Sequence, residues 1–302
     1  MKVAASFLAL ALSGLPVAAQ EVTIDTARGA ESVSTTSETV VAFDLAAVDT
    51  LGALGIPVAG RPDMLGTDYL EASAGNAPVV GTVFEPEFEA VNALAPDLVI
   101  VGGRSSTQYD ALSRIAPTLD MTIPGETLVE TGLDRIDAYG TLFGKEDEAT
   151  ALRERIEDKI ETARAAIDGN GNGLIVLTNG PKVSAYGSGT RFGWVHDTLG
   201  LPEAVETESE GRHGQPVSFE FIAEADPDWL LVIDRAAAIG DEGARAAATL
   251  DNPLVAETTA WREGQVVYLD PADAYLVGGG AQAMERTLDT LIDAFGTAAS
   301  DS

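Results

Sequence analysis

The chain has 302 residues, of which 45% are hydrophobic, no cysteine, and a formal net charge of -30. The hydrophobic content excludes wholesale disorder, and the lack of cysteine excludes disulfides, thiolate chemistry and lipid attachment at a processed cysteine. The strong negative charge argues against nucleic acid or an anionic membrane surface as a partner, because either would repel the chain.

The first residues, MKVAASFLALALSGLPVAAQ, predict a secretory signal peptide over residues 1–19, cleaved after Ala19. One lysine precedes an apolar run, and small residues follow that run. The run is too short to span a bilayer. We therefore expect a periplasmic protein without a direct membrane anchor.

Residues 20–144 are predicted to form an N-terminal α/β lobe, which begins with a loose Ser/Thr-rich arm at 20–37. The stretch TVVAFDLAAVDTLGALGIPVAG, from Thr39, predicts a short strand and then a helix. Further on, FEPEFEAVNALAPDLVIVGGR predicts a helix that ends before Pro96 and a buried strand over 98–101.

Residues 145–168 are free of glycine and proline, and their apolar side chains recur every three or four positions. This spacing predicts an amphipathic helix about 36 Å long. Its position between two similar halves favours a helix that joins the lobes over a surface helix of one lobe. Residues 169–302 then form the C-terminal α/β lobe.

An internal repeat supports the two-lobe division. FEAVNALAPDLVIVGGR, residues 88–104, and FEFIAEADPDWLLVIDR, residues 219–235, are identical at six of 17 positions without a gap. We predict two Rossmann-like lobes with mainly parallel sheets, joined by a single long helix.

Five candidate ligand-binding residues follow predicted strands or precede predicted helices. Because ligands bind beyond the carboxyl ends of strands in open α/β sheets, we expect these residues to share one cleft between the lobes. They are Arg104, Arg191, Arg235, His213 and Tyr275. Three guanidinium groups suit a large, delocalised anion, and an imidazole with a phenol can bind a metal such as ferric iron.

For several other residues, the sequence favours a structural role or leaves two roles open. His196 lies inside a predicted helix and is read as structural, whereas Tyr186 and Trp194 either contact a ligand ring or pack in the core. Glu89 and Glu220 occupy matching repeat positions at helix amino ends, where they stabilise the helix or pair with cations of a partner. DGNGNG, from Asp168, opens like a calcium loop, but Asn179 stands where the bidentate glutamate is required.

Several motifs, taken in order, resemble those of the ferric-siderophore-binding periplasmic proteins of ABC importers, and most of all the petrobactin/catecholate branch. They are VAFDLAAVDTLGALGIPVAG, GSGTRFGWVHDTLG, HGQPVSFEFI, PDWLLVIDRAAAIG and YLDPADAYLVGGG. The resemblance implies the class III periplasmic binding protein fold and a monomer without an intrinsic cofactor. The sequence departs from the family pattern in three features: its strongly acidic composition, the missing lipoprotein cysteine, and Ala274, where a bulkier residue is expected.

The resemblance also implies residue roles. The three arginines would bind an anionic ferric catecholate, His213 and Tyr275 would complete the coordination of its iron, and Glu89 and Glu220 would dock on the inner-membrane permease. Haem, cobalamin or a ferric hydroxamate are alternative ligands of the same fold, but they would not require this set of side chains. A secreted hydrolase using His213 and Glu220 is a further alternative, and it lacks a plausible nucleophile.

Overall fold

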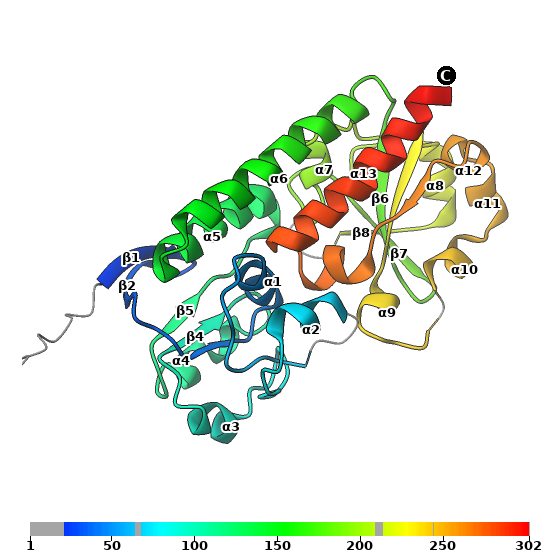
Figure 1. Ribbon diagram of the computed structural model, residues 1–302. Coiled ribbons are helices and arrows are strands. Elements are labelled where there is room, and N and C mark those ends of the chain that lie inside the picture. Colours follow the sequence, from blue (N-terminus) through cyan, green and yellow to red (C-terminus); the bar gives the residue numbers. More distant parts are fainter. Residues whose placement is uncertain (1–20, 64–67, 209–213, 244, 302) are drawn as a thin grey trace, which may run out of the picture.

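The computed structural model describes residues 21–63, 68–208, 214–243 and 245–301. Figure 1 shows two α/β lobes below a pair of long helices, α6 and α13. The strands are β1 (Glu21–Thr26), β2 (Gly29–Ser34), β3 (Val40–Ala42), β4 (Leu98–Val101), β5 (Thr118–Asp120), β6 (Gly173–Asn179), β7 (Lys182–Tyr186), β8 (Gln215–Val217), β9 (Trp229–Asp234) and β10 (Val266–Tyr268).

The helices fall into both lobes and the segment between them. In the first half they are α1 (Leu45–Ala53), α2 (Asp68–Ala74), α3 (Phe88–Ala93), η1 (Ser106–Gln108), α4 (Tyr109–Leu112), η2 (Gly125–Thr127), α5 (Leu128–Phe143) and α6 (Glu146–Ile167). In the second half they are α7 (Trp194–Asp197), α8 (Phe219–Ala225), α9 (Arg235–Ala238), α10 (Ala246–Leu250), α11 (Pro253–Ala256), α12 (Thr259–Arg262), η3 (Ala272–Leu276) and α13 (Ala281–Asp301).

Each lobe is built around one sheet. The N-terminal sheet has the order β3-β4-β5 and is wholly parallel. The C-terminal sheet has the order β10-β9-β6-β7-β8, in which β9 pairs in parallel with β10 and β6, while β7 is antiparallel to both of its neighbours. The carboxyl ends of β4 and β9, the central parallel strands, carry the loops that form the candidate site.

The repeat seen in the sequence is present in the structure as a helix and a strand in each lobe. The helices α3 and α8 begin at its matching phenylalanines, and each is followed by a non-glycine residue with positive φ, Ala95 at 48° and Asp226 at 37°. Each repeat continues with Pro-Asp, and the aspartate has the same contact in both lobes. Asp97 accepts a hydrogen bond from the backbone N–H of Thr39 just before β3, and Asp228 accepts one from the backbone N–H of Asn172 just before β6. The same side chain therefore starts the paired parallel strand in both lobes.

The predicted long helix is α6, and its buried side chains are those that the spacing picked out. It packs along α5 and, in Figure 1, beside α13. Ion pairs join its outer face to α13, between Arg155 and Glu285 at 3.3 Å and between Lys159 and Asp289. The exact lobe boundaries at residues 144 and 168 stay a prediction.

The expected loose arm at 20–37 is wrong for its described part. Residues 21–34 form the antiparallel hairpin β1–β2, and Ile24 and Val33 are buried. Arg135 of α5 donates to the carbonyl of Asp25, and the N–H of Ala27 donates to the carbonyl of Asp120 at 2.8 Å. The hairpin is thus held to the N-terminal lobe by one side-chain and one backbone hydrogen bond, which a Ser/Thr-rich composition does not reveal.

One hydrophobic cluster runs through both lobes. It extends from β3 and α1 through α5, α6 and α13 to β6 and β9, and it includes Trp229 stacked on Phe295 with ring centroids 3.9 Å apart. Two smaller clusters lie on the other faces of the two sheets. Because the lobes share a close-packed core, large changes in their relative orientation would break apolar contacts.

Candidate ligand-binding site

Three arginines from separate elements converge on Tyr275. Arg104 lies in the loop after β4 of the N-terminal lobe, Arg191 lies in the turn between β7 and α7, and Arg235 begins α9 directly after β9. The centroid of the Tyr275 ring is 5.3, 4.5 and 5.7 Å from their respective guanidinium carbons. The sequence prediction that these four side chains lie together is in accord with this geometry.

Tyr275 lies on η3, a π-helix between β10 and α13. The Nη2 of Arg104 donates to the Tyr275 carbonyl at 2.8 Å, its Nη1 donates to the Leu276 carbonyl at 3.3 Å, and Arg191 also donates to the Tyr275 carbonyl. Free carbonyls at a helix end attract cations. Two of the arginines therefore hold the carboxyl end of η3, one from each lobe.

The third arginine acts on the phenol. The Nε of Arg235 donates to the Tyr275 hydroxyl oxygen at 3.0 Å. Burial raises the pKa of Tyr275, but this hydrogen bond and the charges of the three arginines outweigh burial and bring that pKa below its ordinary value. The phenolate form is therefore more accessible here than in a free tyrosine.

The three arginines form no ion pair with a carboxylate of the described residues, although the charge of Arg104 acts on Asp44. Burial and the nearby charge of Arg104 lower the pKa of Arg191, which shows how strongly the positive charge is concentrated. In a chain of net charge -30, a cluster of three guanidiniums without an ion-pair partner among the described residues has the electrostatics expected of an anion-binding site.

Close backbone contacts fix the position of Arg191 between the lobes. A Cβ atom placed on Gly125 of η2 would lie 2.6 Å from the Cα of Arg191, so only glycine allows this approach. Tyr186 packs edge-on against Phe192 at 4.7 Å and is buried. Of the two interpretations of Tyr186, the structure supports core packing.

Sequence reasoning missed Asn179, which is part of the site. Its Oδ1 accepts from the Nη1 of Arg235 at 3.0 Å, so it orients the same guanidinium that binds Tyr275. Asn179 is the last residue of β6, a parallel neighbour of β9. The rule that singled out the arginines, a polar residue at a strand's carboxyl end, would have found it.

A buried polar network supports η3 from behind. Asp273, on η3, accepts from the Nε of Arg286 of α13 at 2.7 Å, and the guanidinium of Arg286 lies 4.8 Å from the ring centroid of Tyr69. The Tyr69 hydroxyl donates to Asp49 at 2.9 Å, and Asp49 also accepts the N–H of Gln282 at 2.7 Å at the start of α13. This network connects α1 and α2 of the N-terminal lobe to the helix that carries Tyr275.

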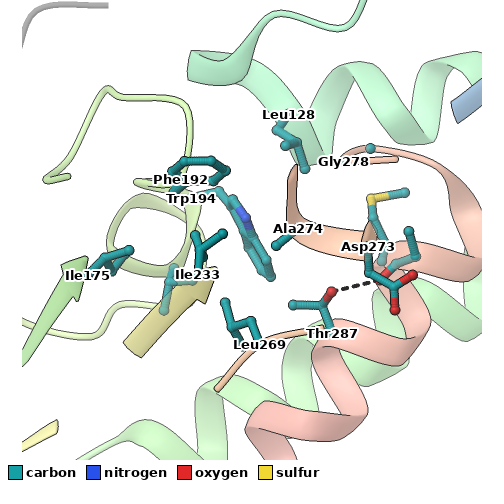
Figure 2. A pocket seen from close by; sticks show the side chains of 14 residues that line it. Leu128, Ile175, Phe192, Trp194, Ile233, Leu269, Asp273, Ala274, Gly278 and Thr287 are labelled. Atoms are coloured by element: carbon teal, nitrogen blue, oxygen red, sulfur yellow. Dashed lines mark hydrogen bonds between the residues drawn. The ribbon is translucent and has the colours of Figure 1, made fainter. Parts of the chain in front are cut away.

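A small apolar cavity of about 20 Å³ lies beneath η3 (Figure 2). Its lining includes Leu128, Phe192, Trp194, Ile233 and Ala274. It has room for about one water and none for a ligand ring. Trp194 and Ala274 of η3 therefore border a space too small for a ligand ring.

The remaining predicted residues lie elsewhere. His213 lies outside the described residues. His196 is buried, and its Nδ1 is 2.7 Å from the carbonyl oxygen of Leu201, which fits the structural interpretation. Glu89 and Glu220 are exposed in the first turns of α3 and α8.

No cluster of three or more His, Cys, Asp or Glu side chains suited to a metal ion occurs in the described ranges.

Two α/β lobes that share a core, with the long helix α6 leading from the first sheet to the second, have the architecture of a class III periplasmic binding protein. The chain belongs to the periplasmic binding protein family, whose model matches residues 40–272.

The chain is similar in sequence and structure to several siderophore-binding proteins. The chain is 36% identical over 258 residues to the petrobactin-binding protein YclQ of Bacillus subtilis, covering 84% of this chain and 81% of YclQ. It is 30% identical over 274 residues to the ferric-anguibactin-binding protein FatB of Vibrio anguillarum, covering 88% and 85%. The crystal structure of YclQ superposes with a TM-score of 0.87, 33% identity and coverage of 91% and 99%, and that of the catecholate-siderophore-binding protein VctP of Vibrio cholerae with 0.84, 29% identity and coverage of 90% and 99%.

Proposed function

We propose that the protein is the periplasmic substrate-binding component of an ABC iron importer, and that it binds an anionic ferric catecholate-type siderophore between its lobes. The observation that carries this proposal is the convergence on Tyr275 of three arginines that form no ion pair within the described part of the chain. The names of YclQ, FatB and VctP support a ferric siderophore as the ligand class.

The residues of the site have two roles, binding of the anionic chelate and ligation of its iron. Arg104, Arg191 and Arg235 bind the anionic oxygens of the chelate, for which the remaining N–H groups of each guanidinium are available. Tyr275 supplies a phenolate to the iron, and its lowered pKa favours that form. His213 supplies the second protein ligand to iron, a role that rests on the family resemblance.

The wider assignments complete the proposal. Residues 1–19 act as a signal peptide, and the mature monomer works in the periplasm as a carrier without bond chemistry of its own. In the described residues, no helix is long and apolar enough to cross a membrane. The carrier delivers its ligand to the inner-membrane permease, on which Glu89 and Glu220 dock.

A titration of tryptophan fluorescence tests the ligand class. The purified protein is titrated with ferric petrobactin, a ferric hydroxamate, haem and cobalamin. We expect tight, saturable quenching by the catecholate complex and weak or no quenching by the other three. Tight binding of haem, cobalamin or the hydroxamate in place of the catecholate would overturn the assignment.

The iron ligands need a separate readout. His213→Ala and Tyr275→Phe should each shift the visible charge-transfer band of the bound ferric complex, because each removes an atom from the iron's coordination sphere. Tyr268→Phe, an exposed tyrosine on β10, is the matched control and should leave the band unchanged. An unchanged band in both site variants would leave these residues as pocket lining.

A further inference from the structure

Exposed hydrophobic side chains are concentrated on one hairpin of the N-terminal lobe. In the described part of the chain, four large hydrophobic residues are strongly exposed, and three of them lie within ten residues: Val79 at 47%, Phe84 at 58% and Phe88 at 40%. We name residues 79–89 the aromatic hairpin. Scattered exposed apolar residues are normal, but a gathered group needs an explanation.

Three hydrogen bonds constrain the backbone of the aromatic hairpin. The N–H of Thr82 donates to the Glu85 carbonyl at 3.0 Å, and that of Glu87 donates to the Val80 carbonyl at 2.8 Å, which closes the turn. Gln108 donates from Nε2 to the carbonyl of Phe84 at 3.1 Å. Phe84 is thus presented to solvent from a fixed backbone, so little conformational entropy would be lost when a partner covers it.

The charge of the hairpin restricts what can cover it. Glu85, Glu87 and Glu89 are all exposed and alternate with the two phenylalanines in the stretch FEPEFE. A second copy of the chain, or an anionic lipid surface, would bring negative charge against these three carboxylates. The complementary partner is a protein surface with an apolar depression surrounded by basic side chains.

The described residues of the second lobe include no such feature. Phe219, the repeat partner of Phe88, is partly buried against the outer core of the C-terminal lobe, and strand β8 precedes it instead of a hairpin. Figure 1 shows α3, which begins within the hairpin, at the end of its lobe away from α6. The two lobes therefore share a glutamate at the repeat position but differ in apolar surface.

We propose that the aromatic hairpin is the anchor by which the N-terminal lobe docks on the importer's permease, and that its absence from the C-terminal lobe gives docking a single orientation. This proposal rests on the proposed function, because that function supplies the partner. Phe84 and Phe88 fill the apolar depression, and Glu85, Glu87 and Glu89 pair with the surrounding cations. Exposed aromatic anchors of this kind dominate the affinity of many interfaces.

Photo-cross-linking in cells of the source organism tests the anchor. A benzophenone amino acid replaces Phe84 in one strain and the control residue Tyr268, exposed on β10, in another. We expect the Phe84 probe to capture a permease subunit, identified by mass spectrometry, and the Tyr268 probe to capture none. Capture of a second copy of the chain or of an unrelated protein, or no capture from Phe84, would overturn the proposal.

A second probe measures the strength of the contact. The benzophenone at Glu224, exposed on α8 of the other lobe, reports docking without touching the hairpin. In the Phe84→Ser, Phe88→Ser background, its cross-link to the permease should fall roughly tenfold or more, the loss typical of an anchor pair. An undiminished cross-link from Glu224 would show that the hairpin does not contribute to docking.

Purified proteins separate the two proposals. The double variant should keep the thermal unfolding midpoint and the affinity for ferric petrobactin of the wild type, because both phenylalanine side chains are exposed and neither is among the residues of the site. If the wild type binds ferric petrobactin but the cross-links fail, only the anchor is refuted. If the wild type does not bind any ferric catecholate, the proposed function itself fails.

Discussion

Arg235 is the site residue whose removal gives the clearest test of anion binding. Its guanidinium donates to the Tyr275 hydroxyl and to Asn179, each at 3.0 Å, and no carboxylate among the described residues neutralises it. Its remaining N–H groups are proposed to bind an anionic oxygen of the chelate, and a hydrogen bond between charged groups contributes about 1.5–3 kcal/mol to binding. Arg235→Gln should therefore weaken binding of ferric petrobactin by roughly 10- to 150-fold.

Two further variants separate the effect of where Arg235 lies from the effect of losing one positive charge. Arg262→Gln removes one positive charge from an exposed arginine of the same lobe, which contacts Thr259 and lies outside the site. It should change the affinity less than about twofold, because exposed charges are screened within roughly 8–10 Å. Arg235→Lys keeps the charge but cannot reach both partners, so we expect an intermediate loss.

Fluorescence titration of the four proteins at two salt concentrations gives the comparison. The reasoning is refuted if Arg235→Gln binds as tightly as the wild type. It is equally refuted if Arg262→Gln loses as much affinity as Arg235→Gln, because the effect would then be one of net charge alone.

Three other perturbations test neighbouring parts of the molecule. Since Arg235 lowers the pKa of Tyr275, the charge-transfer band of the bound iron should develop with rising pH, and Arg235→Gln should move that rise to higher pH; identical pH profiles would contradict the assignment. Burial raises the pKa of Asp49 from 3.8 to about 7, so the native state keeps a proton that the unfolded chain has released, and stability falls as pH rises between those values. Asp49→Asn removes this dependence. The unfolding free energy that the variant loses relative to the wild type, measured with urea, should therefore shrink by up to roughly 4 kcal/mol from pH 4 to pH 8, and a loss that is the same at both pH values would refute the argument. Ala274→Val should fill the cavity beneath η3 and raise the unfolding free energy by about 1 kcal/mol, measured by thermal unfolding, whereas a loss would mean that the cavity is too tight for two methyl groups.

The sequence predicted those parts of the fold that depend on local pattern. The apolar spacing of residues 145–168 located α6 to within one residue at each end. The repeat located α3, β4, α8 and β9 because each lobe uses the same Pro-Asp turn to start its paired strand. The same repeat placed Arg104 and Arg235 at equivalent strand ends, from which both reach Tyr275.

Features that depend on distant contacts could not be predicted. The hairpin β1–β2 has one buried hydrophobic residue in each strand, Ile24 and Val33, which is too weak a period to detect. The π-helix η3 is hydrogen-bonded by Arg104 from the other lobe and, through Asp273, by Arg286 behind it. Asp49 contacts the start of α13 across more than 230 residues of chain. Each of these follows from how the lobes pack, and no local pattern encodes that.

The charge of the whole chain and the charge of the site act on the ligand in opposite directions. At long range, a net charge of -30 repels an anionic chelate and slows its approach, and added salt screens this repulsion. At short range, the three guanidiniums attract the same chelate in a partly buried setting that salt screens much less. Association should therefore become faster with salt while dissociation becomes only modestly faster, so an equilibrium constant can hide both effects. The contribution of Arg235 is accordingly found in the dissociation rate, and a salt series of affinities needs that rate beside it to be interpreted.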